Sequence, residues 1–392
     1  MGQMDTARAS AASALALFGL LGLAGLAACD GDPVPPGLAD GPEPAYEAEL
    51  FRSVLSHLTS PSERPQQGDW PFDQGDAAAY GPGLLLRYGA AGKNAAQLAL
   101  AEESLAHDER TLKRALADIG SLLDQLSEVM MAAMGLIEAQ QRQHDAARAE
   151  KLDKILAVLR VLAKTYDYWP EPEGLNSLHM QLYGPTTVCG GLALLDLELA
   201  LAESGAERER RTKNGLEILE SCRKKGYDAA RGYYRFSSTR AGLFLYPNVM
   251  QMLGLLRAHQ LTGRRDLLEQ ARDLHRAIQP LKVKGEGRYR SPYSAEWMGA
   301  KTDDYTTLSA QNYTLLALAI FHQVTGEPGF RQEVLDILAF LRTHLLDGGR
   351  VLHHWMDGRR ALPTDREYYC SGCNLQLLYL IWRLGEFFHP AA

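Results

Sequence analysis

The sequence predicts an all-α protein built from repeated helical hairpins. From residue 46 onward, segments with helical periodicity alternate with loops rich in Gly, Pro and aromatic residues, and the pattern offers no series of alternating strands. Residues 259–263 (HQLTG) recur 63 positions later as residues 322–326 (HQVTG). Of the 392 residues, 46% are hydrophobic and 23% charged, so the chain can fill a large core.

The N-terminal segment predicts export. Residues 11–26 form an uncharged run as long as the apolar part of a signal peptide, and shorter than the roughly 20 residues of a membrane-spanning helix. The run ends in Leu26-Ala27-Ala28-Cys29, which resembles the lipobox of bacterial lipoproteins. The resemblance implies that residues 1–28 are removed and that Cys29 is lipidated. A buried N-terminal helix with a chance cysteine is the alternative.

The next segment predicts a flexible tether. Residues 30–44 contain five prolines and three glycines, which prevent a regular helix or strand. We therefore expect residues 29–45 to link the lipid to one folded domain, residues 46–392. The protein would be anchored to a membrane of the bacterial cell envelope, facing the periplasm or the exterior.

Residues 93–164 fit a hairpin repeat less well than the rest of the domain. Apolar residues there alternate steps of four and three, which is typical of a coiled-coil seam; they are Leu112, Leu116, Ile119, Leu123, Leu126, Met130, Met134 and Ile137. Either Gly120 and the polar run 140–145 divide the region into packed helices, or a long helical pair projects from the body.

The repeats predict two kinds of helix. Residues 307–324 carry leucines and alanines on nearly every side, which is typical of a helix buried all round, and each such helix precedes an amphipathic one. A fainter copy begins near Leu195, and residues 374–380 echo residues 312–318. An inner ring of helices enclosed by an outer ring would have this pattern, closed as a toroid or running on as an open solenoid.

A family resemblance favours the closed form. The repeated TG turn, Asp303-Asp304-Tyr305, and the motifs GGR at 348–350 and WMDGR at 355–359 lie within residues 186–388. This part of the chain resembles the α/α toroid of six-hairpin glycosidases and N-acylglucosamine 2-epimerase-like proteins. The resemblance implies an α/α toroid with short β-hairpin-like loops at one rim.

The loops that follow the outer helices predict a carbohydrate-binding mouth. In an alternating toroid they gather where the inner helices begin, and they are rich in aromatic and polar residues. Aromatic rings suit the flat apolar faces of sugars, and polar side chains suit their hydroxyl edges. The expected binding residues are Tyr293, Trp297, Tyr305, His354, Trp355 and Glu367. Alternatively, these loops only plug the toroid.

Glycoside hydrolysis needs two carboxyl groups that flank the scissile bond. The candidates at this mouth are Glu296, Asp303, Asp304, Asp365 and Glu367, of which we favour the first three. The adjacent aspartates resemble a pair in α-1,6-mannanase-type toroid enzymes. Capping of the helix that follows them is the alternative role. An epimerase would instead use paired histidines, and His353-His354 is the only adjacent pair.

The cysteines leave two alternatives open. Cys189, Cys222, Cys370 and Cys373 are an even number in an exported chain, and Cys370 with Cys373 could close a small disulfide loop. A weaker hypothesis is a zinc site of Cys189, Cys370, Cys373 and His353, similar to that of lanthionine-cyclase-like toroids. No cofactor is otherwise expected.

Charge excludes one class of partner. The formal net charge of −7 and the absence of a Lys/Arg stripe argue against nucleic acid. The leading hypothesis is a membrane-anchored lipoprotein whose toroid binds a glycan or oligosaccharide and could also hydrolyse it as a glycoside hydrolase. The alternatives are a non-catalytic binding or scaffold lipoprotein and a zinc enzyme.

Overall fold

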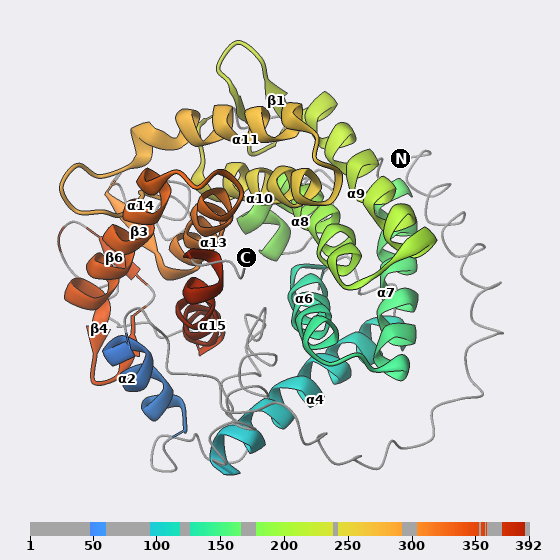
Figure 1. The fold of residues 1–392 in the computed structure, drawn as a ribbon, viewed down its shortest axis with the longest axis horizontal. Helices are drawn as coiled ribbons and strands as arrows, with labels where there is room; N and C mark the ends of the chain where they lie inside the picture. The colour runs from blue at the N-terminus through green and yellow to red at the C-terminus, as the bar shows by residue number, and fades with distance from the viewer. Residues whose placement is uncertain are drawn as a thin grey trace.

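The computed structural model is a closed ring of helical hairpins (Figure 1). It describes residues 48–59, 95–117, 126–165, 178–237, 242–291, 304–352, 354–356, 358 and 371–388. Within these residues, an inner layer of helices is surrounded by an outer layer, and from residue 95 onward successive helices alternate between the two. The predicted α/α toroid is confirmed.

The helices fall into two sets. The inner helices are α6 (Leu126–Arg142), α8 (Leu178–Ala202), α10 (Leu245–Thr262), α13 (Leu308–Thr325) and α15 (Ser371–Phe388). The outer helices are α2 (Ala48–Thr59), α4 (Ala95–Ala117), α7 (Ala146–Thr165), α9 (Gly205–Gly226), α11 (Arg265–Ile278) and α14 (Pro328–Phe340). Two short helical segments, η2 (Gln279–Leu281) and η3 (Leu341–Leu345), extend α11 and α14.

Burial explains the two layers. In α13, every residue from Leu308 to Phe321 except Ser309 is buried, as expected for a helix enclosed on all sides. In α11, the buried residues Leu267, Ala271, Leu274 and Ile278 recur at steps of four and three, so one stripe faces the inner ring.

The repeated TG motif ends an inner helix in each copy. Gly263 and Gly326 adopt φ of 69° and 71°, the left-handed conformation that a glycine reaches without steric cost. Their N–H groups donate to the carbonyls of His259 and His322, each at 2.8 Å. Gln260 and the repeat-equivalent Gln323 are hydrogen bonded at 2.9 Å, so equivalent positions of adjacent repeats touch.

The region 93–164 consists of separate packed helices. α4, α6 and α7 divide it, and residues 143–145 form the break between α6 and α7. α6 packs against both α4 and α8 in the ring. Among the described residues of this region, the helices pack into the ring and do not form a projecting helical pair.

Short two-stranded sheets precede three of the inner helices. β1 (Tyr227–Asp228) pairs with β2 (Tyr233–Tyr234) before α10, and β4 (Leu346–Asp347) pairs with β5 (Arg350–Val351) before α15. β3 (Tyr305–Thr307) lies directly before α13 and pairs with β6 (His354–Met356). All three pairs are antiparallel. We call the end of the ring that carries these hairpins the rim.

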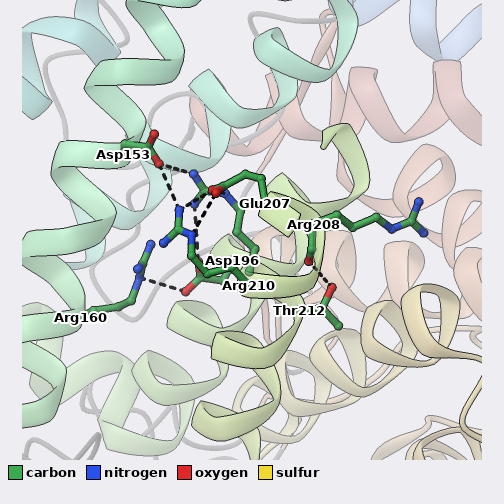
Figure 2. Close-up of polar contacts among 8 residues, drawn as sticks. Asp153, Arg160, Asp196, Glu207, Arg208, Arg210 and Thr212 are labelled. Atoms are coloured by element: carbon green, nitrogen blue, oxygen red, sulfur yellow. Dashed lines mark hydrogen bonds and ion pairs between the residues drawn. The ribbon is translucent and has the colours of Figure 1, made fainter. Parts of the chain in front are cut away.

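A buried ionic network joins two outer helices to an inner helix (Figure 2). Asp196 of α8 lies 3.3 Å from Arg160 of α7 and 3.6 Å from Arg211 of α9. Arg211 also pairs with Asp153 and, at 2.9 Å, with Glu207. Burial raises the pKa of the Asp196 carboxyl, and the charges of Arg160 and Arg211 oppose that shift. The network therefore keeps charged groups paired where three helices meet.

One described segment has the length and apolar character of a membrane-spanning helix, Pro185–Ala202 of α8. Within the fold this segment is 89% buried. It packs against α6, α9 and α10, as a helix of the inner ring does.

Candidate functional site at the rim

Many of the predicted site residues lie outside the described residues. They are Cys29, Tyr293, Glu296, Trp297, Asp303, His353, Asp365, Glu367 and Cys370. Their roles stay predictions. Asp304, Tyr305, His354, Trp355, Cys189 and Cys373 are described, although only the backbone of His354 is.

The β3–β6 pairing brings three of the predicted binding residues together. Tyr305 lies opposite Met356, Thr306 opposite Trp355, and Thr307 opposite His354. The two strands are almost fifty residues apart in the sequence. Two of the aromatic loops therefore meet at the rim.

The side chains of Tyr305 and Trp355 are buried rather than displayed. Tyr305 is fully buried, and burial raises the pKa of its phenol. The Trp355 ring packs edge-on against Phe340 at the end of α14 and against His344 of η3, at 5.7 and 4.9 Å between ring centroids. Trp355 is thus in contact with the outer layer.

Asp304 pairs with a buried arginine. Its Oδ1 lies 2.5 Å from Nη2 of Arg288, whose side chain is only 2% exposed, whereas that of Asp304 is 37% exposed. Arg288 also binds Glu286 at 2.7 Å and donates to Thr306 Oγ1 at 3.0 Å. The guanidinium therefore has a partner on each side, and Asp304 is one of two carboxylates that neutralise it.

Asp304 does not cap α13, which corrects one expectation from the sequence. The N-cap residue is Thr307, whose Oγ1 accepts a hydrogen bond from the backbone N–H of Ala310 at 3.3 Å. Threonine can cap because its hydroxyl reaches the third residue along the helix. The ion pair with Arg288 takes the place of the expected cap contact for Asp304.

A second charged cluster holds the loop before β3 against the outer layer. The Tyr289 hydroxyl donates to Glu333 of α14, which also lies 3.4 Å from His275 and 3.3 Å from Lys282. Burial acts to raise the pKa of Glu333, but hydrogen bonds from His275 and Tyr289 and the charges of His275 and Lys282 outweigh it and lower that pKa to about 2. Glu333 therefore stays ionised and anchors this loop.

Side-chain amides attach three of the described rim loops to the inner helices that follow them. Asn248 of α10 accepts from the N–H of Tyr234 at 2.7 Å and donates to its carbonyl at 3.0 Å. Gln311 of α13 does the same to Tyr289, at 3.1 and 2.8 Å. Asn374 of α15 does the same to Val351, at 2.9 and 2.8 Å. We call these three contacts the amide clamps.

The amide clamps are a repeat feature. Gln311 follows Asn248 by 63 residues, and Asn374 follows Gln311 by 63. Each clamp residue lies in the first turn of its inner helix. Each bonds both backbone polar groups of one buried loop residue, and the Tyr289 carbonyl also accepts from the Thr306 hydroxyl at 3.1 Å.

A different set of polar side chains links neighbouring inner helices near the same end. Nε2 of Gln251 in α10 donates to the carbonyl of Thr186 in α8 at 2.9 Å. The rings of Tyr246 in α10 and Tyr313 in α13 meet edge-on at 5.2 Å. Asn312 of α13 donates to the carbonyl of Cys373 and to Oε1 of Gln376 in α15, at 2.8 and 3.2 Å.

These contacts run through four consecutive inner helices. We name the set the inner-ring polar group; it consists of Tyr246, Gln251, Asn312, Tyr313 and Gln376, with Thr187 added because it lies three residues before Gly190 on the same side of α8. Gly190 of α8 makes room for it, because a Cβ there would lie 2.8 Å from Nε2 of Gln251. Aromatic rings beside amides and a hydroxyl can contact the apolar face and the hydroxyl edge of a sugar.

The other end of the inner ring carries a buried ion pair. Glu198 of α8 and Arg257 of α10 are 3% and 4% exposed and lie 2.7 Å apart. Arg257 also donates to Gln260, and Gln141 of α6 donates to the carbonyl of Glu198. These contacts connect α6, α8 and α10 and so serve packing.

The cysteines differ from the sequence-based alternatives. Cys189 of α8 forms a disulfide with Cys222 of α9, so its sulfur cannot serve as a zinc ligand. Among the described residues, no cluster of His, Cys, Asp and Glu could hold a metal ion. Cys373 is buried at the start of α15. Since Cys370 lies outside the described residues, the Cys370–Cys373 disulfide stays a prediction.

None of the members of the inner-ring polar group was predicted as a site residue from the sequence. Its members lie in apolar helices, where single amides look like isolated exceptions. The amide clamps could have been found, because the 63-residue repeat already aligned Asn248 with Gln311. The C-terminal copy was aligned one residue away, with Asn374 matched to Asn312 instead of Gln311.

Comparison with known proteins identifies the fold. No family model and no curated protein sequence matches the chain. Among solved structures, cellobiose 2-epimerase from Bacillus thermoamylovorans B4167 has a TM-score of 0.60 at 12% identity, covering 86% of this chain and 98% of that one. Cellobiose 2-epimerase from Spirochaeta thermophila DSM 6192 has a TM-score of 0.60 at 13% identity, covering 86% and 94%.

A hydrolase has the same fold. Unsaturated glucuronyl hydrolase from Bacillus sp. GL1 has a TM-score of 0.56 at 12% identity, covering 86% of this chain and 96% of that one. The predicted likeness to six-hairpin toroid enzymes is therefore confirmed for the fold. Fold alone does not fix an activity.

The Arg288 pair gives a test of the role of Asp304. We expect Asp304→Asn to lower the free energy of unfolding by about 1 kcal/mol, because the ion pair with Arg288 becomes a weaker hydrogen bond to a neutral amide oxygen while Glu286 still pairs with the guanidinium. Urea unfolding measures this change. In an Arg288→Met background the same substitution should have almost no effect. An unchanged stability of Asp304→Asn in the wild-type background would contradict the structural role.

Proposed function

We propose that this chain is a carbohydrate-binding protein of the bacterial cell envelope whose ligand contacts the inner-ring polar group. The observation that carries the proposal is the combination of Tyr246 and Tyr313 with the amides of Gln251, Asn312 and Gln376 at the rim end of adjoining inner helices. The solved proteins that share the fold include enzymes named for cellobiose and for glucuronyl groups, which supports a sugar as the ligand class.

Hydrolysis of that ligand is the second candidate activity. It requires two carboxyl groups on either side of the scissile bond. Of the proposed carboxylates, Asp304 is committed to Arg288 in the structure, and Glu296 and Asp303 lie outside the described residues. The binding role therefore leads, and hydrolysis depends on Glu296 and Asp303.

A lipid anchor at Cys29 is the second part of the proposal. It rests on the lipobox-like sequence and on the tether that follows it. The Cys189–Cys222 disulfide supports export, because structural disulfides persist mainly in oxidising compartments. The toroid would then present its ligand site outside the cytoplasm.

The ligand class can be tested on a glycan array with the purified chain. We expect at least one saccharide to bind, and Tyr246→Leu to weaken its binding about three- to tenfold, since the aromatic contact is lost. The matched control is Tyr227→Leu in the β1–β2 hairpin, which should bind as the unchanged chain does. A chain that binds no saccharide contradicts the proposal. Product analysis of the bound saccharide separates a hydrolase from a binder.

The lipid anchor can be tested in cells that carry lipoprotein-processing enzymes. Cys29→Ser should abolish incorporation of radiolabelled palmitate and release the protein from the membrane, because the tether alone has no apolar chain to insert. A Cys370→Ser variant, which keeps Cys29, should still be labelled. Equal labelling of the wild type and Cys29→Ser would refute the anchor.

A further inference from the structure

Four buried polar atoms of the inner-ring polar group have no hydrogen-bond partner among the described residues. They are Oγ1 of Thr187, Oε1 of Gln251, Oδ1 of Asn312 and Nε2 of Gln376. The residues that carry them are 5%, 0%, 0% and 4% exposed. A buried polar atom without a partner costs about 1–3 kcal/mol, so such atoms mark where a ligand or water belongs.

The existing contacts fix which amide atom is the donor and which the acceptor. Gln251 gives its Nε2 to the carbonyl of Thr186, and Asn312 gives its Nδ2 to the carbonyl of Cys373. A carbonyl can only accept, so neither amide can be turned around. The oxygen of each therefore remains as an acceptor.

The same reasoning orients Gln376. Its Oε1 accepts from Nδ2 of Asn312, which leaves Nε2 as a donor. The Thr187 hydroxyl can donate or accept. The group as a whole thus presents two fixed acceptors, one fixed donor and one adaptable hydroxyl, all of them uncharged.

This arrangement selects a particular ligand chemistry. The two acceptors need donors, and a sugar hydroxyl can donate one hydrogen bond while it accepts another. A carboxylate, sulfate or phosphate has no hydrogen to donate, and its charge would be buried next to the oxygens of Gln251 and Asn312. We propose that the inner-ring polar group recognises the hydroxyl groups of a neutral saccharide and discriminates against uronic acids and sulfated sugars. The inference rests on the proposed function and narrows its ligand class.

Thr187 offers the cleanest single substitution. Thr187→Val replaces only the hydroxyl by a methyl group of similar size. Because that hydroxyl lacks a partner in the described structure, its removal should leave thermal stability unchanged or slightly raised. A merely structural threonine would show the opposite, a loss of stability without a change in binding.

Thr314 of α13 provides the matched control. It is fully buried in an inner helix, like Thr187, but its hydroxyl donates to the carbonyl of Ala310 at 2.7 Å. Thr314→Val therefore removes a hydroxyl that is already used within the helix. It should not change saccharide binding.

The experiment uses the full chain on an array of neutral gluco- and manno-oligosaccharides beside uronic-acid and sulfated oligosaccharides of the same lengths. We expect neutral oligosaccharides to bind preferentially. Titration calorimetry with the tightest of them should show binding weakened about five- to tenfold by Thr187→Val, the effect of one lost hydrogen bond between uncharged groups, and unchanged by Thr314→Val.

The outcomes separate this inference from the proposed function. Preferential binding of acidic oligosaccharides would overturn the neutral-sugar inference and leave carbohydrate binding intact. Neutral binding that Thr187→Val does not weaken would overturn the assignment of the site to this group. A chain that binds none of the oligosaccharides would overturn both.

Discussion

The rim of this toroid depends on one repeated interaction, the bidentate hydrogen bonding of an inner-helix side-chain amide to a single residue of the preceding loop. Asn248, Gln311 and Asn374 each make it. A loop that crosses the end of a helical ring cannot use ladder hydrogen bonds along its whole length. The amide satisfies the buried N–H and C=O of one residue and fixes that loop to the ring.

The clamps also explain how one short helix segment serves two purposes. Gln311 turns to the loop and holds Tyr289, while the next residue, Asn312, turns to α15 and joins the inner-ring polar group. Neighbouring residues of a helix point in directions about 100° apart, so one amide can bind the loop while the next binds the neighbouring helix. Four of the buried side-chain atoms that lack a hydrogen-bond partner belong to the inner-ring polar group, on Thr187, Gln251, Asn312 and Gln376.

The architecture could be predicted from the sequence because equivalent residues of a helical repeat recur at a constant spacing along the chain. The two HQxTG motifs, which end at Gly263 and Gly326, predict repeated helical hairpins. The uniformly apolar segment 307–324 predicts an inner helix. The site was harder. The Arg288–Asp304 pair and the Cys189–Cys222 disulfide join residues whose contact depends on packing in three dimensions, and no local spacing encodes either.

The most direct test of the clamps is native-state hydrogen exchange of the three clamped backbone amides, those of Tyr234, Tyr289 and Val351. In an Asn374→Leu variant, the Val351 amide should exchange about tenfold faster, because it loses its acceptor, while Tyr234 and Tyr289 keep theirs and their protection. Unchanged exchange at Val351, or an equal acceleration at all three amides, would contradict the claim that each clamp holds its own loop.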